Sequence, residues 1–306
     1  MATKKSKTSK KSPKTSTTKP KTATKTAKKP ELEAIKTNTV EQKSTESKKL
    51  FSGFFARKYE EKESILTIFK NHKFYGALIG EAIGTMMLAL LLFSLFLMGI
   101  ANVATYTFAF VAVLVAVYAF SGACLNPIIT VGMMASRRIS VIRGVMYIIA
   151  EIIGAWLGWL IFNAFHLAGG ETAYDVPAVS ELAEGTFWLI ALVELLGAAI
   201  IAFFYARAIK YKRSVFTFAA VVAGGLGLAT VVGYVVSAAF LGANNNFVYN
   251  PAVALMMKIF PSSGENFGQI MGGIMQALSI YAIIPMIGGV LGFCLSDTTA
   301  RLVEEE

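Results

Sequence analysis

The chain has 306 residues, of which 55% are hydrophobic, and a formal net charge of +10. This composition, with a mean hydropathy of +0.58, excludes an ordinary soluble domain of this length and indicates a membrane protein with several spans. The two cysteines lie in apolar surroundings and the two histidines lie far apart in the sequence, so we predict no disulfide framework and no metal or cofactor site.

The first 48 residues form a polar and basic segment. Residues 1–30 contain eleven lysines and no acidic residue, and such a composition cannot bury enough apolar surface to offset the entropy lost on folding. We therefore predict that residues 1–48 are a disordered tether. Contact with anionic lipid headgroups is one alternative. Nucleic-acid binding is the other, and it is disfavoured because no aromatic residues are interleaved with the lysines.

Residues 49–74 mix charged side chains with large apolar ones such as Phe54, Phe55 and Phe69. The mixture favours an amphipathic segment that lies on the membrane surface just before the first span. A charged linker with a few aromatic residues is the alternative.

Six apolar stretches are long enough to cross the hydrocarbon core, which takes about 20 residues. They cover approximately residues 76–100, 103–121, 141–165, 187–208, 214–240 and 271–296. Two shorter apolar segments, 127–136 and 251–260, each begin with a proline that follows an asparagine. Proline suits the first position of a helix, and an asparagine before it can cap the unpaired N–H groups. We therefore predict two re-entrant half-helices whose positive ends point at the bilayer midplane.

Charges between the spans predict the orientation of the chain. Residues 136–143 and 207–213 are rich in arginine and lysine, whereas residues 166–186 contain four acidic residues and no lysine or arginine. Positive segments remain in the cytoplasm, so we expect both termini there, including the acidic segment 298–306. The two half-helices then enter the membrane from opposite sides.

Glu81 and Glu194 lie inside the first and fourth apolar spans. Each is followed one span later by an Asn-Pro half-helix, which predicts an inverted repeat with a shared site at the midplane. A charge at the membrane centre costs about 2.5–3.5 kcal/mol, so we expect each carboxylate to bind backbone N–H groups of the loops before the half-helices. A proton relay that includes Glu151 is the alternative. The predicted fold is an all-α membrane protein with six transmembrane helices and two half-helices, over residues 75–297.

Around these features the sequence resembles the aquaporin family, also called the major intrinsic proteins. The resemblance covers residues 75–297, and Glu81 and Glu194 match the paired intramembrane glutamates of that family. The other matching residues are Ser121-Gly122-Ala123, Leu125-Asn126-Pro127, Thr130-Val131-Gly132, Arg138-Ile139-Ser140, Arg143-Gly144, Tyr147, Ala150, Gly154-Ala155, Tyr281, Pro285, Gly288 and Gly292.

The resemblance implies a passive channel for water and small uncharged solutes such as glycerol, present as a homotetramer in the plasma membrane with one pore in each protomer. The motifs Asn126-Pro127-Ile128 and Asn250-Pro251-Ala252 would line the pore. Each asparagine amide offers two N–H donors, which can orient a passing water and so interrupt the hydrogen-bonded chain that a proton needs. The two positive helix ends would repel cations, and Glu81 and Glu194 would brace the loops.

The residues that set selectivity depart from that family. Val253 stands where the family commonly has an arginine, and the loss of five donors and a charge predicts a pore that admits glycerol, urea or other small neutral solutes. Tyr106 takes the place of an aromatic constriction residue, with Gly233 or Tyr234 as its counterpart on the fifth span, although both tyrosines could instead be interfacial anchors. The other departures are Ile128 for alanine, Glu151 for glutamine and Cys124 for histidine. The cysteine is a candidate for the pore wall.

Two other functions stay open at this point. A proton- or ion-coupled transporter would use Glu81, Glu151 and Glu194, and a structural membrane protein would keep the pore closed. An enzyme is not expected, because no nucleophile–base pair and no metal-ligand cluster occur in the spans.

Overall fold

The structure is a computed structural model, and it describes residues 65–97, 103–170, 185–211, 214–240, 247–258 and 267–304. All of them belong to one compact unit, Lys48–Glu306, and within these ranges the regular structure is entirely helical. The predicted disordered tail 1–48, most of the predicted amphipathic segment 49–74 and the acidic loop between residues 171 and 184 lie outside the described residues.

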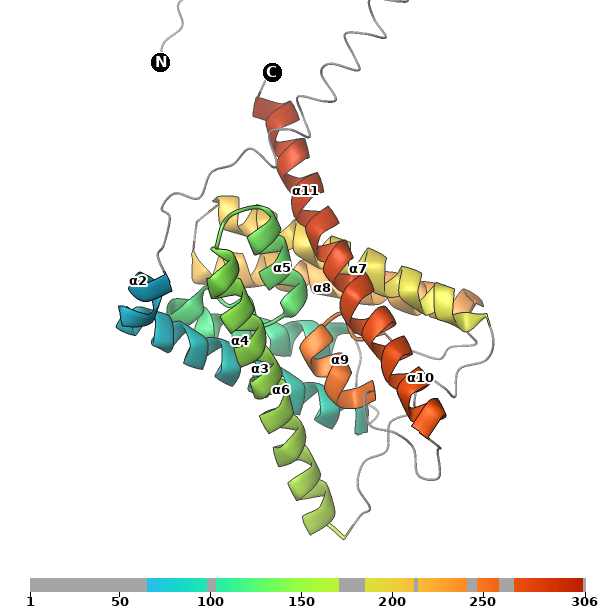
Figure 1. Cartoon of the computed structure of the whole chain (residues 1–306). Helices are drawn as coiled ribbons and strands as arrows, with labels where there is room; N and C mark the ends of the chain where they lie inside the picture. The colour runs from blue at the N-terminus through green and yellow to red at the C-terminus, as the bar shows by residue number, and fades with distance from the viewer. Residues whose placement is uncertain are drawn as a thin grey trace, which may run out of the picture. The chain divides into compact units, whose positions relative to one another are not determined.

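Six helices of the described ranges are long and apolar enough to cross a membrane, which confirms the six predicted spans. They are α3 (His72–Leu97), α4 (Val103–Ser121), α6 (Val141–Ala168), α7 (Thr186–Tyr211), α8 (Val215–Phe240) and a continuous last helix made of α10 (Phe267–Leu278), the π-helical turn η2 (Ser279–Ile283) and α11 (Ile284–Glu304) (Figure 1). A short helix, α2 (Ile65–Lys70), precedes the first span. Because α11 continues to Glu304, most of the segment 298–306 extends the sixth span.

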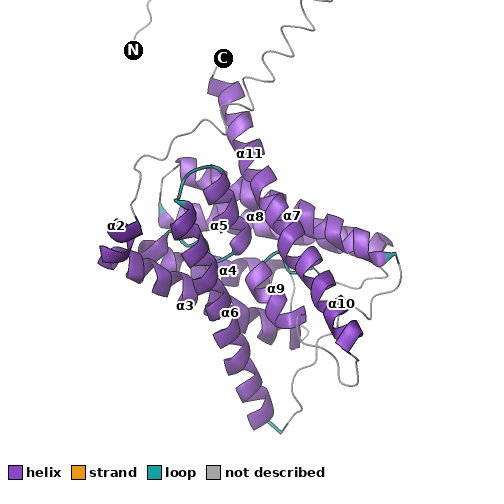
Figure 2. Cartoon of the chain, viewed as in Figure 1, coloured by secondary structure: helices purple, strands orange, loops and turns teal. Residues whose placement is uncertain are grey.

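Two short helices, α5 (Pro127–Ala135) and α9 (Pro251–Lys258), are the predicted half-helices. With nine and eight residues, both are far shorter than the roughly 20 residues that span a bilayer. Each begins at its proline, and the side-chain oxygen of the preceding Asn126 or Asn250 accepts the N–H of the second helical residue, at 3.0 Å and 3.1 Å. Figure 2 shows the loops that lead to the two helices in the middle of the structure.

In each half of the chain, one pair of helices packs through glycines that face backbone carbonyl groups. In the first half α6 lies against α3, and in the second half α11 lies against α7. Gly154 and Gly158 of α6 face backbone carbonyl groups of α3, and Gly288 and Gly292 of α11 face backbone carbonyl groups of α7. A side chain at any of these glycines would overlap the facing backbone, so they let the helices approach closely in lipid. The same close contact therefore recurs in each half of the repeat.

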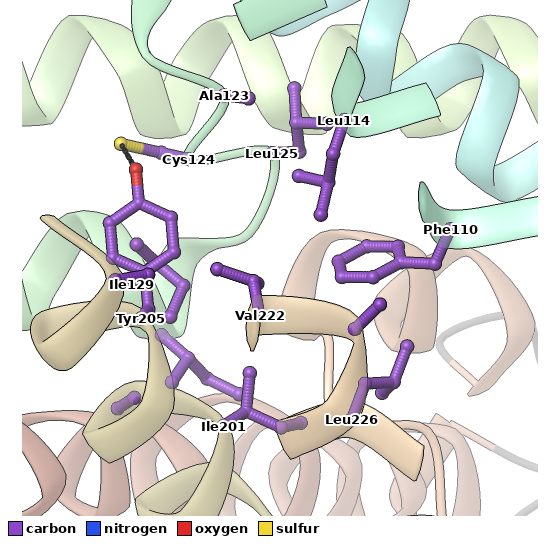
Figure 3. Packing of buried hydrophobic residues seen from close by; sticks show 14 of the residues in the cluster. Phe110, Leu114, Ala123, Cys124, Leu125, Ile129, Ile201, Tyr205, Val222 and Leu226 are labelled. Carbon is purple, nitrogen blue, oxygen red and sulfur yellow. Dashed lines mark hydrogen bonds between the residues drawn. The ribbon is translucent and has the colours of Figure 1, made fainter. Parts of the chain in front are cut away.

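Buried apolar side chains fill the space between the helices, and Figure 3 shows part of the larger cluster. This cluster joins Leu125, which lies just before α5, with Leu114 of α4 and Val222 of α8. The outward faces of the spans carry large exposed apolar side chains, among them Phe108, Phe165, Trp188 and Phe216. The loop before α5 is thus packed in the interior, whereas the outer surface is apolar, as contact with lipid requires.

Candidate functional site

Two hydrogen bonds tie the loops before the half-helices to each other. The side-chain amide of Asn126 donates to the backbone carbonyl of Tyr249 at 2.7 Å, and the amide of Asn250 donates to the backbone carbonyl of Leu125 at 3.0 Å. The two asparagines are therefore neighbours, and the first residues of α5 and α9 face each other. Each asparagine residue is 6% exposed, so both are largely buried where the two halves meet.

The backbone of these loops is irregular. Gly122, Ala123 and Leu125 have φ angles of 88°, 57° and 53°, and Tyr249 has a φ of 54°. These left-handed conformations cost a residue with a side chain roughly 1–2 kcal/mol. Leu125 and Tyr249 are also the residues whose carbonyl groups bind the opposite asparagine. The strained residues therefore lie where the two halves meet. Hydrogen bonds from the surrounding helices are needed to keep the backbone in these conformations.

Glu81 and Glu194 supply such bonds in the same way in both halves. The Glu81 carboxylate accepts the N–H groups of Cys124 and Leu125, at 3.1 Å and 2.6 Å. The Glu194 carboxylate accepts the N–H groups of the two residues before Asn250, at 2.6 Å and 3.1 Å. Both glutamates are fully or almost fully buried. Each buried carboxylate thus binds backbone N–H groups, the arrangement that the sequence analysis expected of a loop-bracing residue.

A glycine three positions after each of these glutamates makes room for the left-handed residue. A Cβ added at Gly84 would overlap the side chain of Leu125, and one added at Gly197 would overlap the ring of Tyr249. The pattern Glu-x-x-Gly therefore has the same structural role in both spans. The carboxylate holds the N–H groups of the loop, and the glycine accommodates the side chain that the turn directs at the helix.

Glu151 of α6 binds only the first loop. Its Oε1 accepts the N–H of Asn126 at 3.2 Å and the hydroxyl of Thr130 at 2.6 Å. Its Oε2 is buried and has no hydrogen-bond partner among the described residues. Glu81 and Glu151 thus bind adjacent N–H groups of one loop, whereas Glu194 binds the other loop.

The position after the second Asn-Pro-Ala motif is apolar and packed. Val253 is fully buried, and it belongs to the same apolar cluster as Ala252. Tyr106 of α4 is partly buried and packs against both apolar clusters. Val253 therefore brings neither a charge nor a side-chain donor to this part of the molecule.

The two candidates on α8 both lie beside Phe247, a residue that the sequence analysis did not single out. The space next to Gly233 is taken by the Phe247 ring and the Tyr249 hydroxyl. The ring of Tyr234 meets the Phe247 ring edge to face, with centroids 5.3 Å apart. The sequence gives no signal that places Phe247 beside α8, because an aromatic residue next to an apolar stretch is common.

The two departures around Asn126 are both enclosed by protein. Ile128 is fully buried, and its backbone carbonyl lies against Gly289 of α11. Cys124 is 4% exposed, and its sulfur lies 3.7 Å from the hydroxyl oxygen of Tyr205. Figure 3 shows this pair. The thiol is therefore directed at α7.

An ion pair holds the far end of the first half-helix. The guanidinium of Arg138, which follows α5, binds both carboxylate oxygens of Asp297 in α11, at 2.7 Å and 3.2 Å. It also lies over the ring of Phe293, 5.1 Å from the centroid. The side chains are only 15% and 10% exposed, so this bidentate pair is less screened than a surface pair. From the sequence, Arg138 was a signal of orientation and part of the family resemblance, and neither predicted this partner.

The histidines and cysteines do not gather. His72 begins α3, and His166 lies in the last turn of α6, stacked on Phe162 with centroids 5.9 Å apart. In the ranges that the structure covers, no three His, Cys, Asp or Glu side chains are placed to hold a metal ion.

Comparisons with known proteins point to one family of membrane proteins. The profile of the family described as Major intrinsic protein matches residues 68–295. Aquaporin TIP4-4 of Zea mays is 28% identical over 180 residues, which are 58% of this chain and 62% of that protein. Aquaporin AqpM of Methanothermobacter marburgensis is 25% identical over 193 residues, 61% of this chain and 71% of that protein. The chain thus matches less than two thirds of the length of the maize relative.

The fold agrees with this result. The X-ray structure of the aquaglyceroporin from Plasmodium falciparum matches with a TM-score of 0.52 and 15% identity, covering 76% of this chain and 100% of that chain. At this level of identity the likeness is one of fold. Because the family profile covers most of the chain and the helices have the matching arrangement, the chain belongs to the major intrinsic protein family.

Proposed function

We propose that this protein is a passive channel for water and small uncharged solutes, with a path that runs past Asn126 and Asn250. The observation that carries the proposal is the pair of bonds between these residues and the opposite loops. Each Nδ2 has two hydrogens, of which one is used on the opposite loop. The second makes no hydrogen bond with any described residue, and each asparagine residue is 6% exposed. On the proposed path, two fixed N–H donors would therefore face a water.

The fixed donors explain how such a channel would exclude protons. A water that accepts from both amides has its oxygen between them, and its own hydrogens point along the path in opposite directions. The hydrogen bonds on either side then run in opposite senses, so a proton cannot hop through. Each half-helix also carries a partial charge of about +0.5 at its first turn. Two such ends that face each other repel hydronium and other cations.

The proposed solutes include molecules of the size of glycerol as well as water. Val253 supports this, because a buried apolar side chain stands where the resemblance implies an arginine. The removal of a guanidinium takes away its charge and five donors, so the outer part of the path should discriminate less against larger neutral solutes. The similar solved structure is described as an aquaglyceroporin.

The assembly and location are part of the same proposal. Membership of the family supports a homotetramer in which each protomer has its own pore. The basic segments 136–143 and 207–213 support a plasma-membrane orientation with both termini in the cytoplasm, since positive segments remain on that side. The many exposed apolar side chains of the spans are compatible with contact between protomers and with lipid.

Stopped-flow light scattering on proteoliposomes tests the proposal. The purified protein should raise osmotic water flow and glycerol uptake above those of protein-free vesicles, with no dependence on a pH gradient or voltage. Flux that requires a proton or ion gradient would instead favour a coupled transporter that uses Glu81, Glu151 and Glu194. The absence of flux under every gradient would favour a structural protein with a closed pore.

A further inference from the structure

One side chain from the second half of the chain reaches into the loop of the first half. The hydroxyl of Tyr205, in α7, donates to the backbone carbonyl of Gly122 at 2.9 Å. The same oxygen lies 3.7 Å from the sulfur of Cys124, as Figure 3 shows. The tyrosine is 2% exposed, and its ring meets that of Phe218 edge to face at 5.2 Å. The hydroxyl is therefore held in place by the packing of the ring.

The direction of these bonds follows from the number of hydrogens. A tyrosine hydroxyl has one hydrogen, and a carbonyl can only accept. The hydrogen of Tyr205 is thus used on Gly122, so the thiol of Cys124 donates to the hydroxyl oxygen. The result is a continuous chain from the thiol through the phenol to the carbonyl.

Tyr205 and Glu81 hold the same short segment from two sides. Gly122 begins the left-handed stretch with a φ of 88°, and the N–H of Cys124 is bound by Glu81. The carbonyl that Asn250 binds belongs to Leu125, the next residue along. A shift of Gly122 or Cys124 would therefore be passed directly to the contact between the two halves.

Within the described residues, α3, the helix that corresponds to α7 in the first half, offers no side chain like Tyr205 to the second loop. Tyr205 follows Glu194 by eleven positions, and the residue eleven positions after Glu81 is Leu92, which is apolar and buried. The second loop is held differently, since the hydroxyl of its own Tyr249 donates to the carbonyl of Ala229 in α8 at 3.1 Å. Within the described residues, the bond from Tyr205 therefore has no counterpart from α3.

We propose that Tyr205 is a positioning residue for the Asn126 loop. This role rests on the proposed channel function. It means that a side chain of α7, in the second half, fixes the backbone before the first half-helix. Without the hydroxyl, the carbonyl of Gly122 loses its donor in a buried place, and such a group seeks another partner. The loop would then shift, and the side-chain amide of Asn126, which orients water in the proposed channel, would shift with it.

The test uses Tyr205→Phe in the full chain, reconstituted in proteoliposomes. Phenylalanine keeps the ring and removes one oxygen. The matched control is Tyr118→Phe, because the ring of Tyr118 packs on the same Phe218 at 4.6 Å and its hydroxyl makes no hydrogen bond within the part of the chain that the structure covers. We expect Tyr205→Phe to lower the water permeability per channel about fivefold or more, to raise the activation energy of water flow and to change the ratio of glycerol to water flux. Tyr118→Phe should leave all three unchanged.

Three results would overturn the proposal. In the first, Tyr205→Phe lowers total flux only in proportion to the amount of folded protein, with the activation energy and the solute ratio unchanged. In the second, Tyr118→Phe changes these two quantities as much as Tyr205→Phe does. In the third, the variant is indistinguishable from the unmodified protein.

A second measurement separates this proposal from the channel function. In a Cys294→Ser background, Cys124 is the remaining cysteine, and its rate of reaction with a small maleimide reports on the loop directly. We expect Tyr205→Phe to accelerate labelling at least severalfold over Tyr118→Phe. If the unmodified protein carries no flux, the channel proposal fails, and labelling alone then decides the positioning role: equal rates in the two variants would end it. Should Tyr205→Phe not fold, Cys124→Ala removes the thiol at the other end of this hydrogen-bonded chain. We then expect the ratio of glycerol to water flux to change, and an unchanged ratio would contradict the proposal.

Discussion

One substitution, glutamate to glutamine, should have opposite outcomes at Glu194 and Glu151. At Glu194 each carboxylate oxygen receives a backbone N–H, at 2.6 Å and 3.1 Å. Glutamine replaces one oxygen by an NH₂ group, which sets two donors face to face and leaves a buried N–H unpaired. A lost bond to a charged group and an unpaired buried donor together amount to roughly 2–5 kcal/mol. We therefore expect Glu194→Gln to unfold far more easily and to lose most of its water permeability.

At Glu151 the same change should be tolerated. Oε1 carries both observed bonds, and Oε2 has no partner among the described residues, so the NH₂ group can take the place of Oε2 without displacing a donor. The weaker bonds of a neutral oxygen are offset by the removal of a buried charge, and we expect a change within about 1 kcal/mol. The assay is thermal unfolding in detergent together with stopped-flow water permeability. Equal losses in the two variants, or a neutral Glu194→Gln, would refute the reasoning.

The other predictions concern space, selectivity and thiol access. Gly197→Ala should cost about 1–3 kcal/mol because its Cβ overlaps the Tyr249 ring, whereas Gly224→Ala, with nothing within 4 Å of the added carbon, should unfold at the same temperature or higher. Val253→Arg should lower glycerol flux more than water flux in proteoliposomes, and an unchanged ratio would contradict the role given to this position. Mercurial reagents should inhibit flux only slowly, because Cys124 is directed at α7, and Cys124→Ser should abolish the inhibition; rapid inhibition would place the thiol on the open path.

The six spans and the two half-helices could be predicted because each has a signal that physics ties to one structure. An apolar run of about 20 residues is long enough to cross the hydrocarbon core and is typical of a span. A proline after an asparagine, at the start of a short apolar segment, indicates the capped start of a half-helix. The glutamates stood out for the same reason, since a buried charge needs partners. Glu81 and Glu194 indeed bind the loops before the half-helices.

The contacts that surround the loops could not be predicted in this way. Tyr205 and Phe247 are aromatic residues in or next to apolar stretches, where such residues are common and give no signal of a particular partner. Asp297 lies 159 residues from Arg138, and one sequence contains nothing that pairs them. Gly84 and Gly197 follow the two glutamates at the same spacing in the sequence. The reason for these glycines is that the side chains of Leu125 and Tyr249 pack against them, which the sequence alone does not show.

The central claim is that the two half-helices meet first turn to first turn, with Asn126 and Asn250 side by side on a path that water can enter. An experimental structure in lipid nanodiscs, at a resolution that shows ordered water, tests it most directly. The account predicts the two cross bonds, from the amide of Asn126 to Tyr249 and from that of Asn250 to Leu125, near 2.7 Å and 3.0 Å. It also predicts a water on the second N–H of both amides. Asparagines that lie apart, or that are sealed from water by apolar side chains, would contradict it.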